Sequence, residues 1–289
     1  MSESLDPRIT PARPDLAAAS LRGKVEAGRF AEGTPHQVIV DAAALHFRPE
    51  ADARLESQLL YGEVFTVYDT REGWCWGQSA TDGYVGYVAA AALAREVTAP
   101  DHMVAALSLH LYPGPDLKLP PVGQIGLGSR VHVTDVDGGF CRIASGDWLF
   151  AKHLVPLDFV MPDLIGTALK FLGVPYLWGG RSWRGLDCSS LVQLTLQLAG
   201  RQAPRDSDMQ AGSVGIEIPM QDSSDFRDVQ EGDLVFFPGH VGFYVDGWRF
   251  LHANAFDMQV SLHRFSDVLD RAEAAGAPAT GIRRVLGSD

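Results

Sequence analysis

The strongest constraint on the fold is an internal repeat in the first half of the chain. The stretch "VDAAALHFRPEAD" at residues 40–52 resembles "VAALSLHLYPGPD" at residues 104–116, with a histidine and a proline at matching places. Further along each copy, "GEVFTVYDTREGWCWG" resembles "GSRVHVTDVDGGFCRI". Short runs of alternating apolar and polar residues, separated by Asp/Gly turns, are typical of small all-β barrels. The repeat therefore predicts two such barrels in tandem.

The segments on either side of the repeat have other patterns. The first residues are rich in Pro, Ala and Arg, and we expect an arm with one short helix around Asp15–Phe30. The second half has two helix patterns, at residues 162–173 and 188–199, followed by the strand-like runs "GDLVFF", "HVGFYV" and "RFLHAN". Helices followed by antiparallel strands predict an α+β domain. The expected organisation is an arm over residues 1–34, barrels over 35–97 and 98–158, and an α+β domain over 159–289.

Charge and composition argue against several classes of function. The 289 residues carry a formal net charge of −12 without a basic patch, which argues against binding to nucleic acid or to anionic membranes. No apolar run approaches the roughly 18 residues that a membrane span needs. The N-terminus also lacks the basic start and apolar block of a secretion signal. We therefore expect a cytoplasmic protein with neither nucleic acid nor membrane as a partner, and the oligomeric state stays open.

The cysteines differ in their surroundings. Three widely spaced cysteines predict neither a disulfide framework nor a zinc site. Cys75 and Cys141 lie between apolar residues in strand-like runs, which is typical of small buried side chains. Cys188, in "GLDCSSLVQ", has polar neighbours and falls on the first residue of a predicted helix. A helix N-terminus lowers the pKa of a thiol from its usual value of about 8.5, which would favour a nucleophile.

A nucleophilic cysteine needs a histidine as general base and a further group that orients the histidine. His240 and His252 lie on adjacent predicted strands. A two-residue turn at Asp246-Gly247 would send their side chains to opposite faces of the sheet. A three-residue loop over residues 245–247, with Gly247 left-handed in a bulge, would place the two histidines directly opposite each other, with Cβ atoms ~5 Å apart. The catalytic interpretation therefore requires a bulged hairpin.

Two other interpretations of the same residues stay open at this point. Cys188 could be a core cysteine at a helix start, because one cysteine and two histidines in a chain of this length are unremarkable. Cys188, His240 and His252 could also be zinc ligands, although no close pair such as Cys-x-x-Cys supports a metal site. We expect neither a metal nor another cofactor.

Four separated motifs resemble a known family. They are "YLWGG" with "GLDCSSLVQ", "PRDSDMQ", "EGDLVFFPGHVGFYVDG" and "FLHAN", and in this order they resemble the NlpC family of papain-like cysteine peptidases of bacterial cell-wall peptides. The resemblance covers roughly residues 160–285. The repeated β modules resemble the bacterial SH3-like domains that precede the catalytic domain in a subgroup, the γ-D-glutamyl-L-diamino acid endopeptidases. The implied fold is multidomain, with two small all-β SH3-like barrels followed by an α+β papain-like (NlpC-type) catalytic domain.

The resemblance implies roles for individual residues. Cys188 is implied as the nucleophile, His240 as the base and His252 as the orienting third member. The hydroxyl of Tyr176 is implied as a donor that helps to stabilise the oxyanion, together with N–H groups at the start of the helix. The implied substrate ligands are Asp187, Ser189, Arg205, Asp206 and Ser207 in this domain, and Tyr84 and Glu56 in the first SH3-like module.

In this scheme the substrate has a free amino terminus and needs a pocket rich in acceptors. Asp187 would bind the ammonium group, Ser189 and Ser207 would add hydroxyls, and Arg205 and Asp206 would bind the substrate carboxylate. Asp187 could instead be a helix N-cap and Arg205 a buried ion-pair partner. In the first module, Tyr84 would close the pocket and Glu56 fits the acidic position better than Glu63, although Tyr84 could equally be an ordinary cross-strand aromatic residue.

Two features depart from the family pattern. Ser190 stands where the family often has glycine, a change that a helix should tolerate. The second module has "SGDWLF" in place of the turn that carries the tyrosine, so we expect that module to be a spacer or packing element.

The implied activity is a cysteine endopeptidase of murein peptide recycling. It would hydrolyse the γ-D-glutamyl-L-diamino acid bond of stem peptides with a free N-terminal L-Ala and release L-Ala-D-Glu. The alternatives are an amidase or acyltransferase on the same scaffold, which would need an open apolar channel in place of the amine pocket, and a non-catalytic protein that binds wall peptides. The intact Cys/His/His set argues against the last, and the preferred diamino acid stays open.

Overall fold

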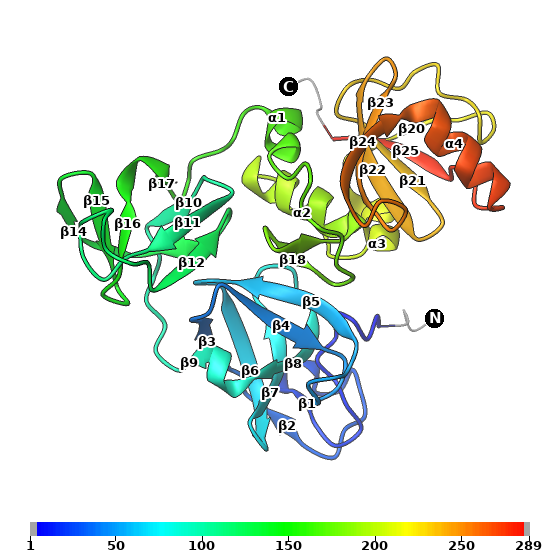
Figure 1. Cartoon of the computed structure of the whole chain (residues 1–289). Coiled ribbons are helices and arrows are strands. Elements are labelled where there is room, and N and C mark those ends of the chain that lie inside the picture. The colour runs from blue at the N-terminus through cyan, green and yellow to red at the C-terminus, as the bar shows by residue number, and fades with distance from the viewer. Residues whose placement is uncertain (1–4, 286–289) are drawn as a thin grey trace. The chain divides into compact units, whose positions relative to one another are not determined.

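The computed structural model describes residues 5–285, and the chain divides into two units between Leu157 and Asp158 (Figure 1). The first unit contains the arm and the repeated segments, and the second contains the α-helices and a six-stranded antiparallel sheet (Figure 1). This division does not separate the arm and the two barrels from one another, so their predicted limits stay predictions. Among the described residues, no helix is long and apolar enough to cross a bilayer.

A seven-stranded antiparallel sheet forms the first repeated segment. The strands, in their order across the sheet, are β5 (Leu55–Leu60), β4 (Ala42–His46), β8 (Val85–Ala89), β7 (Trp74–Ser79), β6 (Val64–Arg71), β3 (Thr34–Val38) and β9 (Leu93–Ala94). Alternate residues of these strands point inward, as their sequence pattern predicts. Leu45, Phe65 and Val88 are fully buried in the resulting core, and Cys75 lies among them as a small apolar residue.

The arm does not form the helix that we expected over Asp15–Phe30. A single 3-10 turn, η1 (Ala19–Leu21), is present, and the short strands β1 (Ala17–Ala18) and β2 (Phe30–Ala31) pair in parallel. The two alanines of β1 are buried one after the other, an arrangement that suits an extended segment against a surface. Gly23 then turns the chain with φ of +80°, which a continuing helix does not allow.

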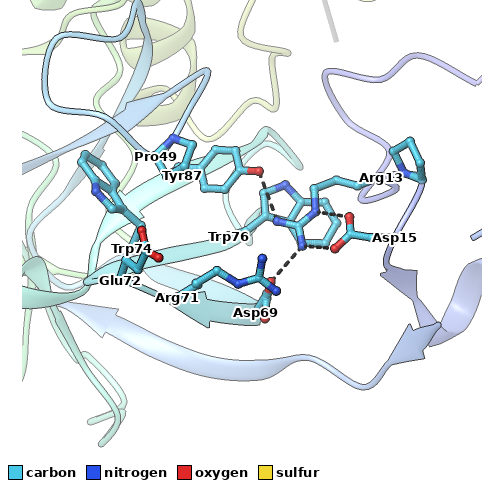
Figure 2. A pocket seen from close by; sticks show the side chains of 10 residues that line it. Arg13, Asp15, Pro49, Asp69, Arg71, Glu72, Trp74, Trp76 and Tyr87 are labelled. Atoms are coloured by element: carbon cyan, nitrogen blue, oxygen red, sulfur yellow. Dashed lines mark hydrogen bonds and ion pairs between the residues drawn. The ribbon is translucent and has the colours of Figure 1, made fainter. Parts of the chain in front are cut away.

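One arginine fixes this arm to the first sheet (Figure 2). Arg13 donates to Asp69 at 2.8 Å and to the hydroxyl of Tyr87 at 3.1 Å. Its guanidinium also lies 4.3 Å from the centre of the Trp76 ring, which adds a cation–π contact. These contacts lie in an open pocket of about 630 Å³ on the first unit. The arm is therefore held by a partly buried ionic network as well as by its short strands.

We predict that Arg13→Gln lowers the free energy of unfolding of the first unit by about 1–3 kcal/mol, because Asp69 and Tyr87 lose a partly buried donor. Urea unfolding of the intact chain measures this change. Arg29→Gln is the matched control, since Arg29 donates to the same Asp69 but is 53% exposed, and it should cost less than about 1 kcal/mol. Equal losses in the two variants would contradict the proposed role of Arg13 in holding the arm.

The second repeated segment consists of small antiparallel sheets. The strands are β10 (His102–Val104), β13 (Arg130–Val131) and β17 (Leu154–Pro156) in one sheet, β11 (Ser108–Leu111) and β12 (Gly123–Gly126) in a second, and β14 (Val133–Asp137), β15 (Phe140–Ile143) and β16 (Trp148–Phe150) in a third. Val104, Ile125 and Leu149 are at the centre of their common core. That this segment is a second SH3-like barrel stays a prediction.

The second unit is built on a six-stranded antiparallel sheet. Its order is β20 (Ile216–Ile218), β25 (Gly281–Arg284), β21 (Leu234–Phe237), β22 (His240–Asp246), β23 (Arg249–Asn254) and β24 (Gln259–Arg264). The helices are α1 (Leu164–Leu169), α2 (Cys188–Leu198), α3 (Ser207–Ser213) and α4 (Phe265–Ala274), and a short hairpin, β18 (Arg181–Ser182) and β19 (Gly185–Leu186), precedes α2. The two helices and three strands predicted from the sequence are present, and β18, β19, β20, β24, β25, α3 and α4 are additional.

The central strands of this sheet are covered by helices. Helix α2 packs against β22 and β23, and α4 packs against β23 and β24. Tyr244 and Phe250 share a core with Phe265 and Val268 of α4. Because both strands are buried along nearly their whole length, their polar residues must find partners inside the protein.

Candidate active site

Helix α2 begins at Cys188 because a capping box fixes its first turn. Asp187 is the N-cap, and its carboxylate accepts a hydrogen bond of 2.8 Å from the backbone N–H of Ser190. The hydroxyl of Ser190 in turn accepts from the backbone N–H of Asp187 at 3.0 Å. The serine that departs from the family pattern therefore completes the cap. The cysteine is thereby held at the first helical position.

A buried ion pair holds the same carboxylate. The two terminal nitrogens of Arg205 donate to the two oxygens of Asp187 at 2.9 and 2.6 Å. The backbone N–H of Gly179 donates a further bond of 2.9 Å. Arg205 is 1% exposed and Asp187 8% exposed, so the pair lies almost entirely out of water. The cap and the ion pair are both observed, whereas the roles of Asp187 and Arg205 as substrate ligands stay predictions.

Further polar groups surround the ion pair. The hydroxyl of Ser189 accepts from Arg205 at 3.0 Å and lies 3.3 Å from a carboxylate oxygen of Asp187. Gln210 of α3 is fully buried, and its amide donates to the carbonyl oxygen of Ser189 at 2.9 Å. Gln210 was not predicted as a site residue, although it is the last residue of the "PRDSDMQ" motif. This glutamine ties α3 to the first turn of α2.

Asp206 and Ser207 lie beside this network, at the start of α3. Asp206 occupies the N-cap position of that helix and Ser207 is its first residue, and both are half-buried. Their predicted contacts with a substrate stay predictions.

We predict that Arg205→Leu destabilises the second unit by about 3–5 kcal/mol, because it leaves the Asp187 carboxylate buried without its counter-ion. Urea unfolding measures the loss. Arg249→Leu is the control, because the ion pair of Arg249 with Asp246 is exposed to solvent, and the unfolding midpoint should barely move. A similar, small effect of both substitutions would show that the Asp187 carboxylate does not depend on Arg205.

The hairpin between β22 and β23 contains a bulge, but not at the predicted place. The predicted three-residue loop over residues 245–247 would pair Tyr244 with Trp248, whereas Tyr244 pairs with Phe250. The unpaired residue is Val245, and Gly247 does not adopt the left-handed conformation that we expected. The side chain of Asp246 explains the difference, because it accepts from the backbone N–H of Arg249 at 3.1 Å and closes a tighter turn.

The bulge nevertheless brings the two histidines onto one face of the sheet. Continuing the pairing of Phe243 with Leu251 places Asn254 opposite His240, so His252 is its diagonal neighbour. Nε2 of His240 and Nδ1 of His252 are 2.7 Å apart, which is a short hydrogen bond. The additional residue in β22 keeps the side chains of His240 and His252 on the same face of the sheet, which the prediction required. The two residues are diagonal neighbours, however, and not directly opposite each other.

Cys188, the first residue of α2, lies beside the start of β22, the strand that carries His240. Its Sγ atom is 4.0 Å from the carbonyl oxygen of Gly239, the residue before His240. The backbone N–H groups of Val241 and Ser189 favour negative charge on the sulfur. The structure therefore brings the predicted nucleophile, base and orienting residue together within the second unit.

Burial controls the protonation of the thiol and the base. Burial, together with the negative charge of Asp187, raises the pKa of the Cys188 thiol to about 12. Burial likewise lowers the pKa of His240 to about 4. The lowering of the thiol pKa that we expected from the helix N-terminus is thus outweighed by desolvation. At neutral pH both shifts favour a protonated thiol on Cys188 and a neutral imidazole on His240.

We predict that iodoacetamide alkylates Cys188 slowly at pH 7, and that the rate rises with pH without a plateau below about pH 10, because only the thiolate reacts. Mass spectrometry of the peptide that contains Cys188 measures the rate, with Cys188→Ser as the blank. A fast rate that is constant between about pH 5 and 8 would instead show a preformed thiolate–imidazolium pair.

Tyr176 is held close to the start of α2. Its backbone forms a bridge with Leu186, and its N–H donates to the carbonyl oxygen of Met258 at 2.9 Å. Burial and the nearby Cys188 raise the pKa of its phenol to about 12, so the hydroxyl is protonated and can donate. Its predicted contact with an oxyanion stays a prediction.

A third histidine lies behind the pair and was missed by the sequence analysis. Nδ1 of His263, on β24, lies 3.0 Å from Nε2 of His252. Asp257 and Arg271 contact the same imidazole. The histidine in "VSLHR" was the available signal, but its proximity depends on a strand pairing that the sequence pattern did not reveal. Within residues 5–285, no group of three or more His, Cys, Asp or Glu side chains is arranged to hold a metal ion.

Glu56 and Tyr84 lie together in the first unit. Both line a pocket of about 290 Å³, where Glu56 accepts from Arg54 at 2.6 Å. Tyr84 is 3% exposed and belongs to the core of the sheet. Glu63 is also buried, and its carboxylate accepts from the backbone N–H of Leu60 at 2.8 Å in a turn. Glu63 is not among the residues that line this pocket, and the roles of Glu56 and Tyr84 as substrate ligands stay predictions.

Comparison with known families agrees with this arrangement. Residues 45–93 match the family described as bacterial dipeptidyl-peptidase Sh3 domain, and residues 173–272 match the NlpC/P60 family. The chain carries a bacterial SH3 domain and an NlpC/P60 domain. The second match includes Cys188, His240, His252 and His263.

Two curated relatives match most of the chain. One is dipeptidyl-peptidase 6 of Lysinibacillus sphaericus, which is 25% identical over 254 residues that cover 80% of this chain and 91% of the relative. The other is a gamma-D-glutamyl-L-lysine dipeptidyl-peptidase of Bacillus cereus, 27% identical over 241 residues, or 72% of this chain and 70% of the relative. The crystal structure of an NlpC/P60 family protein from Bacillus cereus has the same fold, with a TM-score of 0.73 and 22% identity over 88% of this chain and all of that one.

Proposed function

We propose that the protein is a cysteine endopeptidase that hydrolyses the γ-D-glutamyl-L-diamino acid bond of cell-wall stem peptides with a free N-terminal L-Ala. Cys188 lies at the start of α2, beside β22. His240 on β22 is hydrogen-bonded to His252 on β23, and this arrangement is the observation that carries the proposal. The NlpC/P60 match supports a peptidase that acts on peptidoglycan. The relative named gamma-D-glutamyl-L-lysine dipeptidyl-peptidase supports the choice of bond.

The residues at hand are sufficient for acyl transfer. His240 takes the proton of Cys188, and Sγ forms a bond with the γ-carbonyl carbon of D-Glu. The backbone N–H groups near the sulfur and the Tyr176 hydroxyl donate to the developing oxyanion. The protonated His240 then gives its proton to the amine of the diamino acid as the C–N bond breaks, which leaves a thioester.

Hydrolysis of the thioester completes the cycle. His240 removes a proton from water, the hydroxide oxygen attacks the thioester carbonyl, and the C–S bond breaks. The sulfur regains a proton, and L-Ala-D-Glu leaves with a free γ-carboxylate. Because both pKa shifts favour the neutral thiol and the neutral imidazole, we propose that proton transfer to His240 accompanies the attack.

Two finer statements about the fold belong to the same proposal. We infer that residues 98–158 form a second SH3-like barrel, which the internal repeat and the antiparallel pairing of β14, β15 and β16 support. We also infer a papain-like arrangement for the second unit, in which a helix begins at the nucleophile and packs on the strand that carries the base.

The proposed substrate suggests a role in the cell. A stem peptide has a free L-Ala amine only after the bond that joins it to the glycan has been cleaved. A preference for this amine would therefore place the enzyme after an amidase-type reaction, in the recycling of released peptides. On that ground we propose that it acts in the cytoplasm.

We predict that the intact protein releases L-Ala-D-Glu from L-Ala-γ-D-Glu-L-Lys, and that Cys188→Ala abolishes release because no other group can form the acyl intermediate. Liquid chromatography with mass spectrometry measures the product. The N-acetylated peptide is the matched control, and it should be cleaved at least about 100-fold more slowly if the ammonium group binds a buried carboxylate.

The outcomes separate the parts of the proposal. Equal cleavage of the two peptides would contradict the requirement for a free amine. Transfer of L-Ala-D-Glu to an added amine in preference to water would indicate an acyltransferase. Binding without turnover would indicate a protein that only binds wall peptides.

A further inference from the structure

We propose that His263, fixed by Asp257 and Arg271, is a positioning residue that sets the tautomer of His252 and, through it, presents a proton-free nitrogen of His240 to Cys188. Its catalytic consequence depends on the proposed function. The positions of the protons on the three imidazoles do not depend on the proposed function, because they follow from contacts within the second unit.

The contacts form one continuous chain of hydrogen bonds. Nε2 of His240 lies 2.7 Å from Nδ1 of His252, and Nε2 of His252 lies 3.0 Å from Nδ1 of His263. At the far end, Nε2 of His263 lies 2.7 Å from a carboxylate oxygen of Asp257. A terminal nitrogen of Arg271 lies 3.0 Å from Nδ1 of His263. The chain therefore links three imidazoles to one carboxylate and one guanidinium.

The two charged residues determine where His263 carries its proton. An ionised carboxylate only accepts hydrogen bonds, so the Asp257 contact requires a proton on Nε2 of His263. A guanidinium only donates, so the Arg271 contact requires a lone pair on Nδ1. His263 is therefore the neutral Nε2–H tautomer, and its Nδ1 lone pair is shared between two donors.

The same logic continues along the chain. Because Nδ1 of His263 has no proton, the 3.0 Å contact requires Nε2 of His252 to donate. His252 in turn offers a lone pair on Nδ1, so Nε2 of His240 must donate to it across 2.7 Å. His240 is left with a lone pair on Nδ1. That nitrogen is the one available to accept the proton of the Cys188 thiol.

When the orienting residue is a histidine, its own tautomer must be set by a further residue. A carboxylate in that place can only accept, and so it determines the tautomer of the base by itself. An isolated His252 could either donate to His240 or accept from it. Asp257 and Arg271 remove this ambiguity in the tautomer of His252, although both contact His263 and not His252 itself.

Strand register places His263 next to His252 in the same way as it places His252 next to His240. His252 pairs with Ser261 across β23 and β24, so His263 is again a diagonal neighbour on the same face. Asp257 is held in the loop before β24, where its backbone N–H donates to the side chain of Asn254 at 2.8 Å and the hydroxyl of Ser261 donates to its carboxylate at 2.5 Å. The acceptor at the end of the chain is therefore fixed by its own hydrogen bonds.

The direct test is nitrogen-15 NMR of the imidazoles in the intact chain. Long-range ¹H–¹⁵N correlations distinguish a protonated ring nitrogen from one with a lone pair, and single-histidine variants assign the signals. We expect the proton on Nε2 in His240, His252 and His263. A proton on Nδ1 of His240 or His252 would overturn the proposal, whether or not the protein cleaves any peptide.

A pair of nearly isosteric variants tests the catalytic consequence. His263→Asn keeps an acceptor oxygen near the place of Nδ1, whereas His263→Leu removes it. We expect kcat to fall about 10- to 100-fold in the leucine variant with KM almost unchanged, and to fall less than about 3-fold in the asparagine variant. The leucine variant should also lose the single tautomer of His252 in the NMR spectrum.

The controls separate this proposal from the proposed function. His110→Phe, on an exposed residue of the first unit, should leave kcat unchanged. Equal activity of the leucine and asparagine variants would overturn the role of His263, because a purely structural role does not depend on an acceptor. If the wild-type protein cleaves no peptide, the proposed function fails, and the NMR result alone decides the tautomer assignment.

Discussion

The ion pair between Arg205 and Asp187 is the interaction on which the candidate site depends. One carboxylate caps α2, accepts from the loop before that helix and binds the guanidinium, so three segments meet at a single side chain. Removing two charges from water is costly, and this cost is offset only when all their hydrogen-bonding groups have partners. The surrounding N–H groups and the hydroxyl of Ser189 meet that condition. The position of the Cys188 sulfur is a consequence of this buried network.

Strand register is the second constraint. The bulge at Val245 adds one residue to β22, and without it His240 and His252 would point to opposite faces of the sheet. The pairing of β23 with β24 repeats the same diagonal offset one strand further. Three histidines on consecutive strands thus form one line across the sheet. The aromatic ring of Phe250 packs edge-on against His252 in the middle of this line.

The sequence predicted the parts of this site that local patterns determine. The start of α2 at Cys188 followed from its helical pattern, and the need for a bulge followed from the period of two along a strand. The position of the bulge did not follow, because the side chain of Asp246 and not the conformation of Gly247 decides the turn. Asp257, His263 and Arg271 were missed since their contacts depend on the register of β24. The absence of a helix in the arm is also a tertiary effect, because the burial of Ala17 and Ala18 and their pairing with β2 override their helical propensity.

The neutral state of the buried thiol has a consequence for the lifetime of the protein. Peroxides oxidise a thiolate and not a thiol, first to a sulfenic acid and then irreversibly to higher acids. A sulfur whose pKa lies at about 12 presents almost no thiolate at neutral pH. The Cys188 sulfur is therefore poorly reactive towards oxidants while the site is empty, and in the proposed reaction it becomes a nucleophile only as its proton passes to His240.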